Sequence, residues 1–221
     1  MGVKNELASG DNARERTIRF EEYLSLLDCA SPHFKPVLTV AYNTGMRSGE
    51  LQKLQWSHID RKNMFIRLPK EITKKKRARN IPINHHVKTV LDNLPRSIKH
   101  EFVFTNYKGK RKGKSLSQKN GFAHLFKSAC KKAGITYGEE VKNGAVFRDI
   151  RTTFKTNMLD AKIDRVYRDL IVGHKLKGMD DYYLKPNEDT LKGQMEGFTQ
   201  WLDGQLNSVN VDQSVDQGKV A

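Results

Sequence analysis

The stretch Arg148-Asp149-Ile150-Arg151-Thr152-Thr153-Phe154 carries the strongest structural signal in the sequence. Apolar residues recur at helical spacing across it and just beyond: Phe147, Ile150, Phe154 and Met158. This pattern predicts a helix with one face against a core. Arg148 and Arg151 stand three residues apart, so we expect both on the neighbouring face of that helix. Two guanidiniums held in this way suit a cluster of anionic oxygens.

A Gly-His pair and two tyrosines follow this helix. A second helix is expected over residues 164–172, and Gly173 can end it because glycine tolerates a chain reversal. His174 comes next, and Tyr182 and Tyr183 lie eight and nine residues beyond it. Arginines, a histidine and a tyrosine can carry out phosphoryl transfer without a metal. Taken singly, each residue also fits a basic helix with a core histidine and two packed tyrosines.

The composition indicates a polyanion as partner. The chain has 221 residues, with 40 Lys and Arg against 25 Asp and Glu, a net charge of +15. Phosphate contacts would supply most of the affinity for a nucleic acid. Anionic lipid is the rival, but the charge falls mainly in predicted loops and not along one helix face. No apolar run reaches the ~18 residues of a membrane span, and the N-terminus lacks a signal-peptide core, so no membrane contact is expected.

The cysteines and histidines predict neither a disulfide framework nor a metal site. Cys29 and Cys130 are the only cysteines, which indicates a reducing cytoplasm. The sequence has no CxxC or HExxH spacing, and we expect none of its seven histidines to cluster with acids. His85 and His86 follow Pro82 closely, so they are predicted at the start of a helix and not in a metal site. We expect no metal and no cofactor.

Short helices are expected near the N-terminus. Residues 1–16 are polar and predict a flexible lead or linker. Helices are expected over 20–29 and 34–43, with Pro36 in the first turn of the second and Gly45 just past its end.

Arg47 lies at the junction between two predicted helices. Ser48 can cap the second of them, with Glu50 in its first turn. Backbone N–H groups at a helix N-terminus already favour an anion, so Arg47 is well placed to bind one. A surface arginine beside a helix cap is the alternative interpretation.

Two basic segments are predicted to contact DNA. Strand-like patterns over 63–68 and 80–83 flank a basic connection, 70–79, and predict a β-hairpin. Its lysines could protect a sheet edge or enter a DNA groove. Residues 107–121 are predicted to form a mobile basic loop that DNA could order. The candidate DNA contacts are Lys75, Lys76, Arg77, Arg79, Lys110, Arg111 and Lys112.

Further helices complete a mainly α fold with one small antiparallel sheet. They are expected over 87–94 and within 116–134. Asn187 can cap a final helix, whose apolar stripe is Leu191, Met195, Phe198 and Leu202. This helix either packs on its own domain or is lent to a neighbour, and the sequence leaves both open. One domain is thus expected over 17–206, followed by a disordered tail over 207–221.

In this order, the residues resemble the catalytic domain of the tyrosine recombinases, the phage-integrase family, over roughly residues 16–205. Thr44-Gly45-Met46-Arg47-Ser48-Gly49-Glu50-Leu51 is similar to the family's first arginine box, which makes Arg47 the first catalytic arginine. Thr73-Lys74, with Ile81-Pro82-Ile83 after it, looks like the family's β-hairpin lysine. The resemblance therefore implies a catalytic Lys74.

The remaining motifs match residue by residue, with one departure. Arg151 matches the second arginine of the family's His-x-x-Arg box, and Gly173-His174 matches its Gly-His box. The family's nucleophile lies nine residues past that histidine, which gives Tyr183, with Tyr182 as the fallback. Arg148 stands where the family usually has His and sometimes Lys. Arginine is not deprotonated in proteins, so Arg148 cannot be a general base, although it can hold a phosphate oxygen.

The resemblance implies a transesterification on DNA. The Tyr183 hydroxyl would attack a backbone phosphate and leave a 3′-phosphotyrosyl link and a free 5′-hydroxyl, with neither ATP nor metal. Arg47 and Arg151 would clamp the phosphate oxygens, and His174 would hold an oxygen or assist proton movement. Lys74 would be the general acid for the departing 5′-oxygen.

The leading prediction is a site-specific recombinase, the integrase of a phage or other mobile element, acting in the cytoplasm at a bacterial or host-cell nucleoid. Implied partners are double-stranded attachment sites, a tetramer of the protein on DNA joined through the helix 187–205, and an N-terminal DNA-binding domain outside this chain. Glu50 is expected to orient Arg47. A type IB topoisomerase-like enzyme is one alternative. A DNA-binding regulator with weakened or lost catalysis is the other, and Arg148 keeps it open.

Overall fold

The computed structural model of the protein describes residues 16–96, 100–106, 112, 114–116, 122–176 and 186–217. The helices in this part are α1 (Phe20–Cys29), α2 (Lys35–Thr44), α3 (Ser48–Gln52), α4 (His85–Asn93), α5 (Ala123–Lys132), α6 (Asp149–Asp160), α7 (Arg165–Val172) and α9 (Glu188–Gln217). A 3-10 turn, η1 (Trp56–His58), precedes the strands β1 (Ile59–Asp60), β2 (Phe65–Leu68) and β3 (Arg79–Pro82). The prediction of a mainly α fold with a small antiparallel sheet is confirmed.

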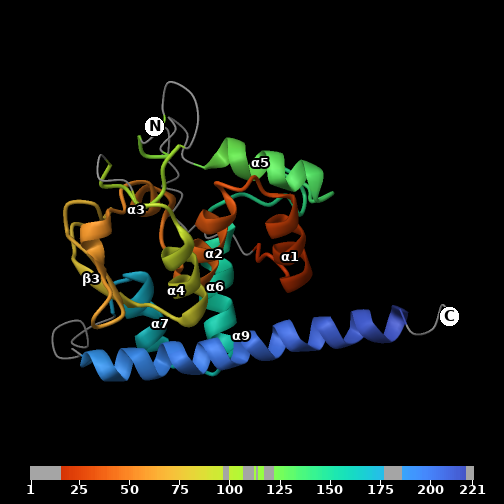
Figure 1. The fold of residues 1–221 in the computed structure, drawn as a ribbon. Coiled ribbons are helices and arrows are strands. Elements are labelled where there is room, and N and C mark those ends of the chain that lie inside the picture. The colour runs from red at the N-terminus through yellow and green to blue at the C-terminus, as the bar shows by residue number, and fades with distance from the viewer. Residues whose placement is uncertain are drawn as a thin grey trace, which may run out of the picture.

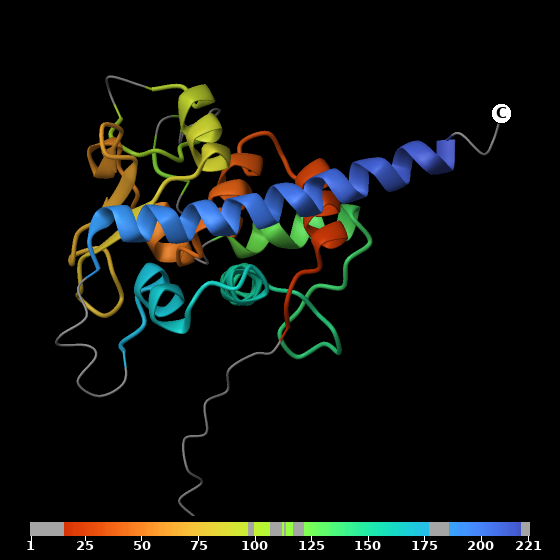
Figure 2. The ribbon, with the colours of Figure 1, turned by 90° about the horizontal axis from the view of Figure 1, so that it is seen from below.

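The helices form a body with the sheet on one side. Helices α2, α4 and α6 lie in the middle, α1 and α5 lie on one flank, and the strands lie on the other (Figure 1). The long helix α9 runs beneath all of them. Figure 2 shows it crossing the whole body and extending beyond α1. The apolar core is continuous across these elements, from Ile18 before α1 to Leu202 in α9.

The end of α2 lies against α6. Gly45 ends α2 in the left-handed conformation (φ +59°), as the sequence predicts. A Cβ on Gly45 would lie 2.5 Å from Phe154 Cδ1, so the close approach of the two helices depends on glycine. Asn157 Nδ2 also donates a hydrogen bond to Tyr42 Oη at 2.8 Å. This packing sets Arg151 of α6 against the turn that follows α2.

The basic connection joins two strands of the three-stranded sheet. Its order is β1-β2-β3 with antiparallel pairing throughout. In the hairpin, Phe65 pairs with Pro82 and Leu68 with Arg79. The predicted hairpin is confirmed, and residues 69–78 connect its strands beside the body.

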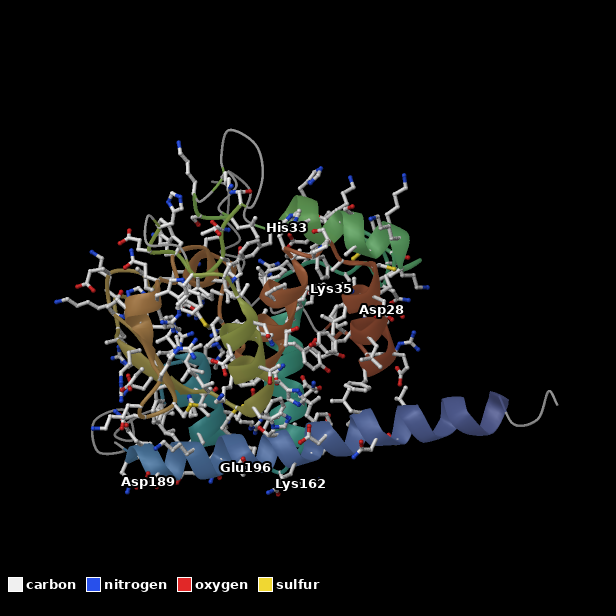
Figure 3. The ribbon with its side chains drawn as sticks, in the orientation of Figure 1. Asp28, His33, Lys35, Lys162, Asp189 and Glu196 are labelled. Carbon is white, nitrogen blue, oxygen red and sulfur yellow. The ribbon has the colours of Figure 1, made fainter. Side chains whose placement is uncertain are left out.

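Helix α9 packs on the body of its own chain. Its apolar stripe is buried, and the Phe198 ring lies 5.1 Å from the Phe154 ring of α6 in an edge-on arrangement. Arg67 of β2 forms an ion pair with Glu188 at the start of α9. Charged side chains on α9, including Asp189 and Glu196, point away from the body (Figure 3). Of the two arrangements that the sequence allows, the single chain shows the self-packed one.

Helix α9 is longer than the sequence predicts. The sequence predicts a disordered tail from residue 207, whereas α9 continues to Gln217. No glycine or proline lies between Gly204 and Gly218 to stop the helix. Residues 1–15 and 218–221, which were also expected to be flexible, lie outside the described residues. Among the described helices, none is both long and apolar enough to cross a membrane.

Candidate functional site

Most of the predicted catalytic residues line one open pocket. The pocket has a volume of about 920 Å³ and is bordered by α3, the β2–β3 connection, α6 and the end of α7. The predicted catalytic residues in its wall are Arg47, Lys74, Arg148, Arg151 and His174. Tyr183 and the fallback Tyr182 lie outside the described residues.

Glu50 holds Arg47 at the pocket wall. The Glu50 carboxylate is buried, and its Oε2 accepts a hydrogen bond from the Arg47 backbone N–H at 2.8 Å. Its Oε1 accepts a second bond from Arg47 Nη1 at 3.2 Å. Arg47 therefore precedes α3 as its cap residue, and the Glu50 carboxylate satisfies its N–H. The predicted cap by Ser48 is wrong, because Ser48 is already the first residue of the helix.

Arg79 binds the same carboxylate from the sheet. Its two Nη atoms donate to the two oxygens of Glu50 at 2.8 Å each, and its Nε donates to the Ile171 carbonyl at 3.1 Å. Only 8% of the Arg79 side chain is exposed. Arg79 therefore faces inward from β3 and joins α3 to α7, whereas the sequence predicts it as a DNA contact. Gly173 makes room for it, since a Cβ there would lie 2.8 Å from Arg79 Cδ.

Arg151 completes a cluster of guanidiniums. Its Nη1 donates to the Gly45 carbonyl at 2.7 Å and its Nη2 to the Val172 carbonyl at 2.5 Å. Burial, and then the charges of Arg47 and Arg79, lower the pKa of Arg151 to about 9. The guanidinium therefore keeps its charge at neutral pH.

The cluster carries more positive than negative charge. Arg47 and Arg79 bind the Glu50 carboxylate, and Arg151 lies close enough for the charges of Arg47 and Arg79 to lower its pKa. Burial alone would raise the pKa of Glu50, but the hydrogen bonds and charge of Arg79, and then those of Arg47, lower it below the usual range. Glu50 is therefore ionised and offsets one of three charges. An anion bound in the pocket would offset the remainder.

Thr73 fixes the connection that carries Lys74. Its buried Oγ1 accepts the Arg77 backbone N–H at 3.0 Å and donates to the Lys70 carbonyl at 3.1 Å. Lys76 takes the left-handed conformation (φ +49°) in the same turn. Lys74 itself is exposed and lines the pocket. The long, flexible lysine side chain can therefore reach a ligand there from an anchored backbone.

Two residues that the sequence reasoning missed surround His174. Asp169 Oδ1 lies 2.6 Å from Lys155 Nζ and 3.3 Å from His174 Nδ1. The His174 backbone N–H also donates to the Asp169 carbonyl at 2.8 Å. Lys155 lines the pocket and lies one helical turn beyond Arg151. This spacing is the sequence feature that predicts both side chains on the same face of the helix. Asp169 gave no signal, because a carboxylate in an amphipathic helix is ordinary.

Arg148 and Arg151 differ in their surroundings. Arg148 lies just before α6 and forms an ion pair with Glu139 of the preceding loop, with 61% of its side chain exposed. Both line the pocket, although only Arg151 binds backbone carbonyls there. Arg168 of α7 also lines the pocket, and within the described part of the chain its buried Nε has no hydrogen-bond partner.

The remaining predicted DNA contacts lie partly outside the described residues. Lys75, Lys76 and Arg77 are exposed on the β2–β3 connection, and Lys112 is exposed as well. Lys110 and Arg111 lie outside the described residues.

The lowered pKa of His174 predicts how the free energy of unfolding depends on pH. Burial, and then the charges of Arg151 and Lys155, lower this pKa from 6.5 to about 4, against the opposing effect of Asp169. Between these values the unfolded chain takes up a proton that the folded chain does not. The free energy of unfolding is therefore expected to be fully retained above about pH 6.5 and to fall as the pH drops towards about 4. His174→Gln should show a shallower fall, by up to about one proton per molecule.

Urea unfolding of both proteins at a series of pH values from about 7 to about 4.5 measures this difference. His124→Gln is the matched control, because His124 is an exposed histidine on α5 that does not line the pocket. It should keep the slope of the wild type. An equal slope for the wild type and His174→Gln would contradict the prediction.

Comparison with known proteins identifies relatives in sequence and in fold. Residues 16–189 match the sequence model of the phage integrase family. No curated protein sequence matches the chain.

Solved integrase structures share the fold. The integrase from mycobacterium phage Brujita has a TM-score of 0.64 and 16% identity, over 86% of this chain and 60% of that one. A lambda integrase dimer bound to a COC′ core site has a TM-score of 0.60 and 19% identity, over 81% of this chain and 52% of that one. The lambda integrase catalytic core has a TM-score of 0.58 and 18% identity, over 74% of this chain and 94% of that one. The chain thus spans about half of the DNA-bound lambda integrase and has the fold of the catalytic core.

Proposed function

The chain belongs to the phage integrase family, and we propose that it is a site-specific DNA recombinase, the integrase of a phage or other mobile element. The observation that carries the proposal is the guanidinium cluster: Arg47 and Arg79 bind the carboxylate of Glu50, and Arg47 and Arg151 line the pocket beside it. A DNA phosphate supplies the anion that such a cluster lacks.

In the proposed first step, Tyr183 is the nucleophile. Its hydroxyl oxygen attacks the phosphorus, the bond to the 5′-oxygen breaks, and the DNA 3′ end stays on the tyrosine. Arg47 and Arg151 bind the non-bridging oxygens, where negative charge grows in the transition state. Lys74 donates its proton to the departing 5′-oxygen. In the reverse step, a 5′-hydroxyl of a partner strand attacks the phosphotyrosyl link and restores the tyrosine.

His174 is the residue we propose to receive the tyrosine proton, because Arg148 cannot be a base. Its low pKa leaves the free imidazole neutral, with a lone pair on one ring nitrogen. Arg151 and Lys155 are among the causes of that low pKa, and a bound phosphate would offset their charge. The phosphate thereby raises the basicity of His174 when the substrate is in place. Asp169 orients the His174 ring through its contact with Nδ1.

A nicked suicide duplex tests the proposed function. The chain is incubated with a duplex carrying the element's attachment site, in the presence of EDTA and without ATP, and resolved on a denaturing gel. The nick lets a short 5′-hydroxyl fragment diffuse away and traps the covalent product. We expect a slow-migrating protein–DNA band that proteinase treatment removes. Binding in a parallel shift assay without any such band would instead favour a DNA-binding regulator.

Arg151→Ala is expected to slow formation of this band by about 10²–10³-fold, since one lost donor to a transition-state oxyanion has an effect of that size. Quantifying the band over time measures the rate. Arg61→Ala is the matched control, because Arg61 is an exposed arginine paired with Asp92 outside the pocket. It removes the same charge and should leave the rate within about threefold of the wild type, as expected for a surface pair. Equal rates for the two variants would contradict the role of Arg151.

Assembly on DNA is part of the proposal. One of the similar structures is a lambda integrase tetramer bound to a Holliday junction, and we propose that this chain also acts as a tetramer on paired attachment sites. We propose that the helix 187–205 leaves its position on its own chain and packs on a neighbouring subunit of the tetramer. An enzyme of the type IB topoisomerase kind would relax supercoiled DNA as a monomer. Relaxation of a plasmid that lacks attachment sites would favour that alternative.

A further inference from the structure

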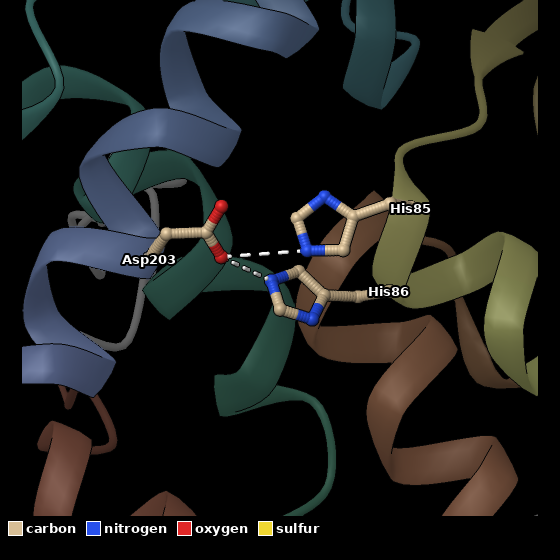
Figure 4. A group of neighbouring side chains, drawn as sticks. All are labelled: His85, His86 and Asp203. Atoms are coloured by element: carbon tan, nitrogen blue, oxygen red, sulfur yellow. Dashed lines mark hydrogen bonds and ion pairs between the residues drawn. The ribbon is translucent and has the colours of Figure 1, made fainter. Parts of the chain in front are cut away.

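Three side chains that bind metals in other proteins meet where α9 crosses the start of α4 (Figure 4). His86 Nε2 lies 2.9 Å from Asp203 Oδ1, and His85 Nε2 lies 3.4 Å from the same oxygen. The two rings lie side by side, with their centroids 4.0 Å apart. The expectation that no histidine clusters with an acid is therefore wrong, because Asp203 reaches the pair from a helix far along the chain. His85 and His86 do begin α4, as predicted.

The spacing of the three ligand atoms fits a small tetrahedral ion. One ligand atom from each residue lies within 4.8 Å of the other two. Zinc ligands at ~2.0–2.1 Å in a tetrahedron lie about 3.3 Å from one another. The two distances to Asp203 Oδ1 fall on either side of that value, so small side-chain rotations would suffice to close the site. We propose that His85, His86 and Asp203 form a binding site for a divalent transition metal, Zn²⁺ in particular, with water as the fourth ligand.

The donor set selects the class of metal. Two imidazoles and one carboxylate suit Zn²⁺, Cu²⁺ and Ni²⁺, whereas Mg²⁺ and Ca²⁺ prefer a full set of oxygens. The side chain of His86 is 21% exposed, that of Asp203 40% and that of His85 57%. The site is therefore closed on the side of the body and open to solvent on the other, which leaves a path for the ion and room for water.

The backbone that carries the ligands is held in place before any metal arrives. Asn84, just ahead of the two histidines, is buried; its Oδ1 accepts the Val87 N–H at 3.0 Å, and its Nδ2 donates to Asn43 Oδ1 at 2.8 Å. Asp203 follows Leu202, which is buried in the core. Ligands on two anchored helices need little ordering to bind an ion, which favours affinity.

A metal at this position would fasten α9 to the body of its own chain. The bond would join residues 117 positions apart in the sequence. The ion would contact none of the proposed catalytic residues in the arginine pocket, because the three ligands do not line it. Zinc would stabilise the folded chain, since the unfolded chain does not hold the ligands together.

Calorimetric titration of the untagged chain with ZnCl₂, after removal of metals by a chelator, tests the proposal. We expect saturable binding of one ion per chain. His85→Ala, His86→Ala and Asp203→Asn should each weaken binding by at least about tenfold, since even an outer partner of a ligand has an effect of that size. His124→Ala, which removes an exposed histidine from α5, should bind as the wild type does. Titration with Co²⁺ should give the visible absorption of a tetrahedral ion.

Thermal unfolding supplies a second measurement that does not depend on heats of binding. Zinc at about 100 times its dissociation constant should raise the Tm of the wild type by about 5 °C or more. At the same zinc concentration the Tm of His85→Ala, whose exposed side chain is the least costly of the three to remove, should rise by about half as much or less. Absence of saturable binding in the wild type would overturn the proposal. Binding that survives all three ligand substitutions would overturn it equally.

Discussion

Tyr183→Phe is expected to abolish the covalent protein–DNA band completely, because it removes the protein atom that the proposed reaction joins to phosphorus. The guanidinium cluster and Lys74 would be untouched, so DNA binding in a shift assay should stay within about twofold of the wild type at the same salt concentration. Loss of the band with retained binding is the signature of a missing nucleophile. A loss of both would indicate a different defect.

Tyr182→Phe is the matched control, because it makes the same change one residue earlier. It should form the covalent band at a rate close to that of the wild type. If Tyr182→Phe loses the band and Tyr183→Phe keeps it, the nucleophile lies eight residues past His174 and the assignment is wrong. If both variants keep it, neither tyrosine carries the DNA.

Glu50→Gln is expected to lower the free energy of unfolding by about 3–5 kcal/mol, as breaking a buried ion pair does. Only 1% of the Glu50 side chain is exposed, and it accepts hydrogen bonds from both Arg47 and Arg79. Glutamine keeps the shape but removes the negative charge that Arg47 and Arg79 bind. The remaining charges then repel one another, and the nearly complete burial of Arg79 limits how far water can screen the repulsion.

Urea unfolding of Glu50→Gln and Glu139→Gln side by side measures this effect. Glu139 is also paired with an arginine, Arg148, but in that pair both side chains are more than half exposed. The control should therefore change stability by no more than about 0.5 kcal/mol. Similar effects of the two substitutions would contradict the account of the cluster.

Much of the fold follows from local sequence patterns. The stripe around Phe154, the glycines at Gly45 and Gly173 and the cap at Asn187 each predict an element that the structure contains. These features act within a few residues along the chain, which is why a sequence shows them. The full extent of α9 does not follow from the sequence, because its last turns are polar and polar composition predicts disorder.

The site was predictable only in part. Motif spacing predicted Arg47, Lys74, Arg151 and His174, and these line one pocket. The sequence does not predict that Arg79 binds Glu50, because a run of basic residues is typical of a solvated surface. Only the alternation of β3 and its packing on α7 turn this arginine inward.

Contacts between distant segments were beyond the reach of the sequence. Asp169 meets Lys155 and His174 through the packing of α6 on α7. Asp203 meets His86 only because α9 crosses α4. Local sequence spacing predicts neither contact, because the partners come from separate helices whose relative placement is set by the core.

Identification of the residue that carries the DNA tests the central claim most directly. The covalent product from the suicide duplex is digested with nuclease and protease, and the modified peptide is sequenced by mass spectrometry. The account predicts a single peptide with a nucleotide joined through its 3′-phosphate to Tyr183. A nucleotide on any other residue would contradict the proposed nucleophile, and DNA that binds the chain without any covalent product would contradict the proposed recombinase.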